Sequence, residues 1–301
     1  MTRSIAYTAS VKKIVGLLAL GMTLTGLTAA DSVQVSIEFS ERSYVPGEDI
    51  LAKIVIVNFS GSDLELGSRP GWLRLIPKSL ASATVHALKA PDRISPFIVP
   101  NGKEGKYPIN LSEFFRFDKI GPYTIQPVIS IGHRLEDIRP GYPRPFDIVT
   151  PATMHEQPFG VRVGPDLRFS QRVYTVQRLT RGRHMVFVKV SDQNTGDLIG
   201  LAALGHIVGF SREVKFQMDR LNNLHTLHQT GAQTFRHHVI TPHGKLTARE
   251  THLVDASRRK PRLLKDAHGR VSVIGGRPHP QADDIPMLKL PEHVPSSLSK
   301  K

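Results

Sequence analysis

The sequence predicts an all-β protein with an N-terminal β-sandwich, a second small β-rich domain and a disordered basic tail. Three observations favour this fold class. Apolar and polar residues alternate over 32–40, which is the pattern of a half-buried strand. Short apolar runs rich in β-branched residues follow, most of them separated by turns that contain glycine or proline. The 24 glycines and 22 prolines among 301 residues supply those turns.

The first domain is expected to span residues 31–163. Val33, Val35 and Ile37 predict the buried face of its first strand, and the apolar run 50–57 predicts a central strand. Further short strands are expected at 64–66, 72–76, 84–88, 97–99, 107–111 and 123–129. Residues 133–158 contain five prolines and little alternation, so they are expected to form a long loop or linker. A last strand at 159–163 would then precede a boundary near residue 164.

Two segments of this domain resemble immunoglobulin-like domains of exported bacterial and macroglobulin-type proteins. They are Tyr44-Val-Pro-Gly-Glu48, which leads into Ile54-Val-Ile-Val-Asn58, and Phe117-Asp-Lys-Ile-Gly-Pro-Tyr-Thr-Ile125. The resemblance covers about a third of the chain and implies an immunoglobulin-like sandwich. It also implies that Tyr123 forms a tyrosine corner by bonding to upstream backbone. Asp118 and Tyr123 are one residue further apart than in the family, and the cysteine pair of antibody domains is missing.

The second domain is expected to span residues 164–255. Its predicted strands are at 173–176, 185–190, 198–204, 214–218, 224–229, 234–241 and 246–253. Leu221, Leu224 and Leu227 lie three apart, so a short helix is the alternative there. Residues 256–301 lack periodicity, and their high charge with few aromatic residues predicts a disordered tail.

The first thirty residues predict a cleavable signal peptide. Three basic residues precede an apolar run at 14–27, and small residues follow at 28–30. An N-terminal membrane anchor is the alternative, but glycine and threonine interrupt the run, and it is shorter than a bilayer span prefers. We therefore expect export to the periplasm or the extracellular space. The absence of cysteine excludes disulfides, thiolate nucleophiles and cysteine-ligated zinc.

The basic residues of the tail predict an anion-binding surface. Residues 256–301 carry 10 basic and 4 acidic side chains. Arg258, Arg259, Lys260 and Arg262 are the candidate contact residues, with acidic envelope polymers or another envelope protein as partners and peripheral membrane contact as a further option. Nucleic acid is not expected, because the chain is exported and no aromatic residues interleave with the basic ones to stack bases.

Histidine is the one enriched residue type that suggests different chemistry. Eleven of the 14 histidines lie in the second domain and the tail. A hairpin with a four-residue loop at 230–233 would place His225 opposite His238 on one face and His237 opposite Thr226. His228 or His243 could then complete a metal site. The alternative function is therefore a metal-dependent enzyme or metal-binding protein that uses His225, His237 and His238. No Asp or Glu lies between His225 and Arg249 to complete such a site.

Motifs of catalysis and cofactor binding are missing from the sequence. There is no Gly-x-Ser-x-Gly nucleophile elbow, no phosphate-binding glycine loop and no dinucleotide fingerprint. We therefore predict a non-enzymatic binding or envelope-assembly protein that has no cofactor and no catalytic residues.

Overall fold

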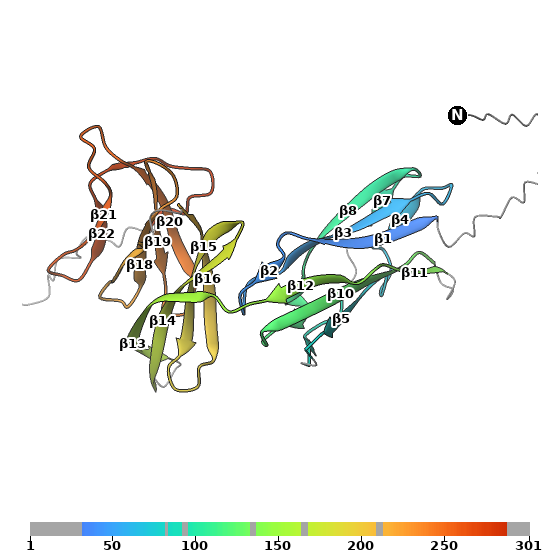
Figure 1. Cartoon of the computed structure of the whole chain (residues 1–301), viewed down its shortest axis with the longest axis horizontal. Helices are drawn as coiled ribbons and strands as arrows, with labels where there is room; N and C mark the ends of the chain where they lie inside the picture. The colour runs from blue at the N-terminus through green and yellow to red at the C-terminus, as the bar shows by residue number, and fades with distance from the viewer. Residues whose placement is uncertain are drawn as a thin grey trace, which may run out of the picture.

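The computed structural model describes residues 32–81, 84–91, 96–132, 137–163, 168–208 and 213–287. Within them the chain consists of strands and loops with short 3₁₀ turns such as η2 (Leu111–Glu113), which confirms the all-β fold class. The described residues include no helix long and apolar enough to cross a membrane. The predicted signal peptide, residues 1–30, lies outside them. Figure 1 shows the strands in two groups joined end to end, here called the first and second domains.

The first domain is a sandwich of two sheets. Its strands are β1 (Val33–Phe39), β2 (Ser43–Tyr44), β3 (Leu51–Asn58), β4 (Leu64–Leu66), β5 (Leu73–Ser79), β6 (His86–Ala87), β7 (Phe97–Val99), β8 (Lys103–Asn110), β9 (Phe115–Arg116), β10 (Gly121–Ser130), β11 (Ile138–Pro140) and β12 (Arg144–Ile148). One sheet has the order β1-β3-β8. The other has the order β11-β10-β12-β2, with β5 on the free side of β10. β4 pairs with β7, and β6 pairs with β9.

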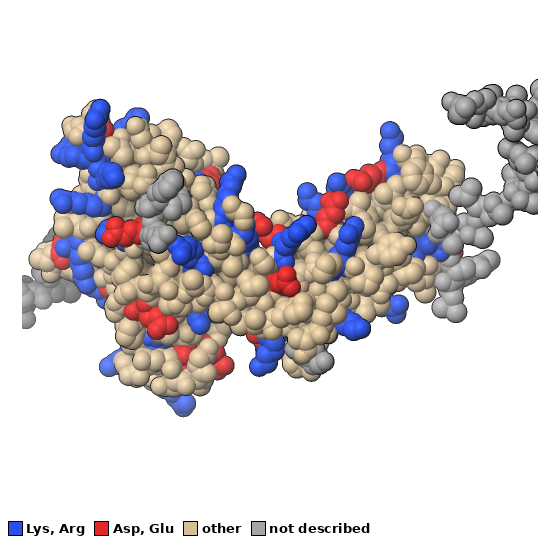
Figure 2. Space-filling model, in the orientation of Figure 1, with Lys and Arg blue, Asp and Glu red and all other residues tan. Residues whose placement is uncertain are grey.

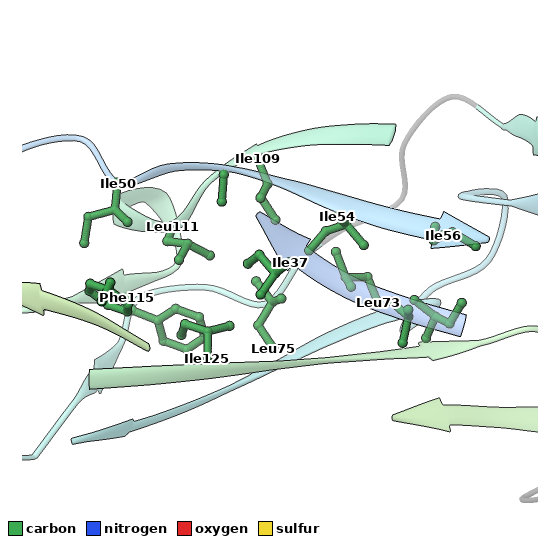
Figure 3. Packing of buried hydrophobic residues seen from close by; sticks show 14 of the residues in the cluster. Ile37, Ile50, Ile54, Ile56, Leu73, Leu75, Ile109, Leu111, Phe115 and Ile125 are labelled. Carbon is green, nitrogen blue, oxygen red and sulfur yellow. The ribbon is translucent and has the colours of Figure 1, made fainter. Parts of the chain in front are cut away.

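The alternation predicted at the start of this domain is present in the structure. Val33, Val35 and Ile37 of β1 are buried, and β1 pairs with β3 along its whole length. Figure 3 shows Ile37 pointing across the sandwich toward Leu75 of β5. Burial of each such aliphatic side chain contributes about 1.5–3 kcal/mol to stability, so this alternation fixes which face of β1 points inward.

Tyr123 makes the contact that the immunoglobulin-like resemblance implies. Its hydroxyl donates a hydrogen bond to the carbonyl oxygen of Lys119, 2.6 Å away. Its ring packs edge-on against Phe117 and stacks on Phe146, with centroid distances of 5.2 and 5.7 Å. The backbone contact of the tyrosine corner is thereby confirmed, and the immunoglobulin-like classification stays a prediction.

The boundary between the domains lies earlier than predicted. Residues 133–158 were expected to be a linker, but β11 and β12 pair with β10 of the first domain. The alternating residues Phe146 and Ile148 drive this, because both are buried in the core despite the nearby prolines. The segment 159–163 was expected to close the first domain. It belongs to a strand of the second domain, so the boundary falls between Ile148 and residue 152 and not near 164.

The second domain also contains two main sheets. Its strands are β13 (Ala152–Val163), β14 (Arg168–Arg181), β15 (Arg183–Asp192), β16 (Leu198–Ile207), β17 (Lys215–Met218), β18 (Leu224–Gln229), β19 (Thr234–Ile240), β20 (Leu246–Leu253), β21 (Arg262–Lys265), β22 (Val271–Ile274) and β23 (Arg277–Pro278). One sheet has the order β13-β14-β15-β16, and the other has the order β17-β18-β19-β20-β23. Tyr174 and Val188 of the first sheet share an apolar core with Leu224 and Ile240 of the second. The alternative helix around Leu224 is wrong, because this residue begins β18.

The predicted disorder of the tail is wrong for residues 256–287. β21 and β22 form a hairpin that packs on β17 and β18, and β23 pairs with β20. Asp255 and Asp266 stabilise two turns by accepting backbone hydrogen bonds from Arg259 and Arg270, respectively. The charge of this segment predicts disorder, but these Asp-centred turns and the buried Val271 give it an ordered structure. Residues 288–301 lie outside the described part of the chain.

Two glycines bring the sheets of the second domain into backbone contact. Gly244 has φ +75°, and a Cβ added there would lie 2.6 Å from Cα of Gly200 on β16. We expect Gly244→Ala to lower the free energy of unfolding by about 1–3 kcal/mol more than Gly182→Ala. Gly182 is the matched control, because it has φ +71° and no atom within 4 Å of an added Cβ. Urea unfolding followed by circular dichroism measures both, and equal losses would contradict the close approach.

A buried ion pair joins the two domains. Arg181, the last residue of β14, donates two parallel hydrogen bonds to the carboxylate of Glu48 at 3.1 and 2.7 Å and a third to the carbonyl oxygen of Ser43 at 2.9 Å. The two side chains are only 10% and 11% exposed. Val45 of the first domain packs beside them against Phe187 of the second. Polar and apolar contacts therefore hold the domains together at one place.

Candidate functional site

The predicted histidine site is corrected by one residue of strand register. Gln229 pairs with Phe235, so five residues, 230–234, separate the paired positions of β18 and β19, one more than the predicted four. His225 therefore lies opposite Val239, and His238 lies opposite Thr226. Successive side chains of a strand point to opposite faces, so His225 and His238 are on different faces of the sheet. The structure brings His225 and His237 together and separates His238 from both.

A row of polar side chains crosses the face that carries His225 and His237. It consists of Asp219, His225, His237, Glu250 and His252, and we call it the histidine row. Nε2 of His225 lies 3.4 Å from Oδ2 of Asp219, and Nδ1 of His225 lies 3.1 Å from Nε2 of His237. Nδ1 of His237 lies 3.0 Å from Oε2 of Glu250, and Nε2 of His252 lies 3.8 Å from the same oxygen.

Burial and hydrogen bonds together determine the charge states of His237, Glu250 and Asp219 in the histidine row. His237 is 0% exposed, and this burial lowers its pKa although the hydrogen bond to Glu250 opposes the effect. The contact with His237, and to a smaller extent the contact with His252, holds the pKa of Glu250 far below its ordinary value. Burial acts to raise the pKa of Asp219, but hydrogen bonds from His225 and Asn223 outweigh it and lower this pKa. The row thus combines neutral imidazole with ionised carboxylates.

The opposite face of the same sheet buries a second pair of imidazoles. His228 and His238 are stacked with centroids 5.3 Å apart and an interplanar angle of 7°. Neither ring makes a hydrogen bond of good geometry with any part of the chain that the structure describes. Burial is the main cause that lowers the pKa of His228 to about 4, and it also lowers the pKa of His238. Arg236 and Arg249, which bind the carboxylate of Asp283, lie at one edge of this pair.

The predicted anion-binding residues lie close together in the chain, with Arg258, Arg259 and Lys260 on the connection between β20 and β21 and Arg262 at the start of β21. Arg258, Arg259, Lys260 and Arg262 are all exposed. Arg259 is held by Asp255 through its Nε at 2.8 Å, and Arg258 adopts φ 59° at the turn. Figure 2 shows Lys and Arg side chains gathered over the end of the molecule that carries β21 and β22. The cations are therefore presented by a folded turn.

Sequence reasoning missed Asp219, Glu250 and His252. Glu250 is the first residue after the 225–249 segment that was found to lack acidic residues. Glu250 and His252 are two apart on one strand, so they share a face. Glu250 also lies opposite His237 in the β19–β20 pairing. This Glu-x-His spacing on a predicted strand is the signal that could have found the site.

Comparisons with known proteins give the chain no family. No family model matches it. No curated protein matches it either. Among solved structures, it is similar to the sporulation control protein Spo0M from Bacillus subtilis at 10% sequence identity, over 57% of this chain and 89% of that chain, with a TM-score of 0.27.

Proposed function

We propose that the chain is an exported, non-enzymatic binding protein that attaches to acidic envelope polymers through Arg258, Arg259, Lys260 and Arg262. The observation that carries the proposal is the presentation of these four exposed cations on one ordered stretch, which consists of the β20–β21 connection and the first residue of β21. Phosphate or carboxylate groups on an envelope glycan or lipid headgroup are the matching chemistry. The export signal at residues 1–30 supplies the periplasmic or extracellular location.

Local charge pairing favours an external partner for three of the four cations. Arg259 forms an ion pair with Asp255. Within the described residues, Arg258, Lys260 and Arg262 form no ion pair with an acidic side chain. Cations that are not neutralised within the fold attract anionic polymers over about a Debye length. The turn fixes their positions, so less conformational entropy is lost on binding.

Removal of these three charges is expected to abolish attachment at low salt. The test variant is Arg258→Asn, Lys260→Gln, Arg262→Gln, because asparagine tolerates the positive φ of position 258. Each basic residue contributes about 1 kcal/mol at an anionic surface, so affinity should fall about a hundredfold. Sedimentation of the purified protein with the envelope fraction, from low to high salt, measures this.

The matched control removes three exposed cations from the first domain. Lys53→Gln, Arg74→Gln and Lys78→Gln change the net charge by the same amount, and all three positions are exposed. This control should remain bound at low salt and be released at high salt, like the unchanged protein. Equal loss in both variants, or retention of the unchanged protein through high salt, would contradict the proposal.

A further inference from the structure

In the histidine row, the contacts of His225 and His237 need one more hydrogen-bond donor than these two rings supply. Its three contacts, Asp219 to His225, His225 to His237 and His237 to Glu250, each need one N–H group. A neutral imidazole carries a single N–H, so two neutral rings supply two donors for three contacts. A cation at one of the three contacts would remove the deficit.

The position beside Glu250 is the contact at which several ligand atoms surround a possible cation. Ligand atoms of His237, Glu250 and His252 all lie within 4.8 Å of one another. Ligands at about 2.1 Å from a tetrahedral ion are about 3.4 Å apart. The observed 3.0 Å from Glu250 to His237 and 3.8 Å from Glu250 to His252 lie on either side of that value. Nε2 of His252 is buried and makes no hydrogen bond with the described residues, so its lone pair is available.

We propose that His237, Glu250 and His252 form a binding site for a divalent first-row transition metal ion of the zinc class. Two imidazoles and one carboxylate suit such an ion, whereas calcium and magnesium prefer sites made of oxygen ligands. Three protein ligands leave a fourth position for water or an anionic ligand. The side chain of Glu250 is 30% exposed, which gives that position a route to solvent.

The remaining members of the row act as positioning residues for the metal ligand. With the ion on Nδ1 of His237, Nε2–H of this ring donates to Nδ1 of His225, and Nε2–H of His225 donates to Asp219. Both rings are then neutral and every contact has one donor. Backbone N–H of Met287 lies 3.4 Å from Oε1 of Glu250 and holds that oxygen, which leaves Oε2 for the ion. Such second ligand shells typically change metal affinity 10–100-fold.

The strand pairing explains why this arrangement forms in the folded chain. Glu250 lies directly opposite His237 on the neighbouring strand. His252 follows Glu250 by two residues and therefore projects from the same face. His225 lies diagonally across from His237 in the β18–β19 pairing. The ligands are thus set by the register of β19 and β20, and the positioning residue His225 is set by the register of β18, so the site is preorganised for binding.

Zinc titration of the full mature chain, made without a histidine tag and stripped with chelator, tests the proposal. Isothermal calorimetry should find one zinc ion per chain. His252→Ala and Glu250→Gln should each weaken binding at least a hundredfold, and Asp219→Asn should weaken it 10–100-fold. His228→Leu is the matched control, because it removes a buried imidazole from the opposite face of the same sheet and should leave zinc affinity unchanged.

Two further readouts separate ligand loss from misfolding. Zinc should raise the melting temperature of the unchanged protein and of His228→Leu, but not of Glu250→Gln. The absorption spectrum of bound Co²⁺ should show an intense four-coordinate signature that Asp219→Asn alters and His252→Ala abolishes. Absence of stoichiometric zinc, or equal affinity in folded His252→Ala and the unchanged protein, would overturn the proposal. Envelope attachment needs none of these ligands, so the two proposals fail separately.

Discussion

Replacement of Arg181 by alanine is expected to lower the free energy of unfolding by about 3–5 kcal/mol. The reason is the carboxylate of Glu48, which would stay buried between the domains without its bidentate partner. The carbonyl oxygen of Ser43 would lose a hydrogen bond as well. Urea unfolding followed by the fluorescence of Trp72, the single tryptophan, measures the stability of the first domain directly.

A double substitution separates the electrostatic contribution of this ion pair from the packing contribution of its two side chains. Glu48→Leu combined with Arg181→Met should recover most of the loss, because apolar replacement of a buried ion pair is often close to neutral. Arg183→Ala is the control, since this arginine is exposed at the start of the adjacent strand. We also expect Arg181→Ala to separate the fluorescence and circular dichroism transitions, because the domains would unfold independently. If the two transitions of Arg181→Ala coincide, at the same urea concentration as in the unchanged protein, the apolar contacts alone hold the domains together.

Acid is expected to destabilise the second domain through His228. The pKa of this imidazole is about 4 in the folded chain and 6.5 in the unfolded one. As the pH falls through 6.5, the unfolded chain gains a proton that the folded chain cannot accept until the pH approaches 4. The destabilisation by His228 is therefore absent at pH 7, and at pH 4 it lowers the free energy of unfolding by about 3 kcal/mol. Arg236 on β19 and His206 on β16 also disfavour the charged ring, whereas the backbone of His206 favours it.

His228→Leu should remove this part of the acid sensitivity. The variant should be about as stable as the unchanged protein at pH 7, because it also removes two ring nitrogens that lack protein partners. At pH 4 it should be more stable by about 3 kcal/mol. His268→Leu is the control, because this imidazole is exposed in the folded chain. Urea unfolding at both pH values measures the difference. If the free energies of unfolding of the unchanged protein and of His228→Leu change with pH in parallel, the assignment to His228 is contradicted.

Local pattern was sufficient to predict the strands with a clear alternation or apolar run, and insufficient to predict β12 or the partners of the strands. The alternation of Val33, Val35 and Ile37 identified β1, because a strand with one buried face carries a period of two in its own sequence. The domain boundary was misplaced because Phe146 and Ile148 are only two buried residues among several prolines. A two-residue alternation carries too little signal to outweigh proline, and only the pairing with β10 reveals β12.

The metal ligands depended on a register that the sequence does not specify. One extra residue between the paired positions Gln229 and Phe235 placed His238 on the face opposite to His225. The pairing of β19 with β20 placed His237 opposite Glu250. The contact between Arg181 and Glu48 joins residues 133 apart, so no local spacing could indicate it. Residue types therefore pointed to histidine chemistry in the second domain, whereas tertiary packing determined which histidines meet.

Order of synthesis has a consequence for the sheet that carries the histidine row. Thr251 of β20 receives its outer partners from later in the chain, through the backbone N–H of His279 and the carboxylate of Asp284. While the ribosome has produced only the chain up to β20, that strand has an open edge and Arg249 lacks Asp283. The sheet therefore closes only after about thirty more residues have emerged. An incomplete chain would expose this edge to proteases or to other nascent chains.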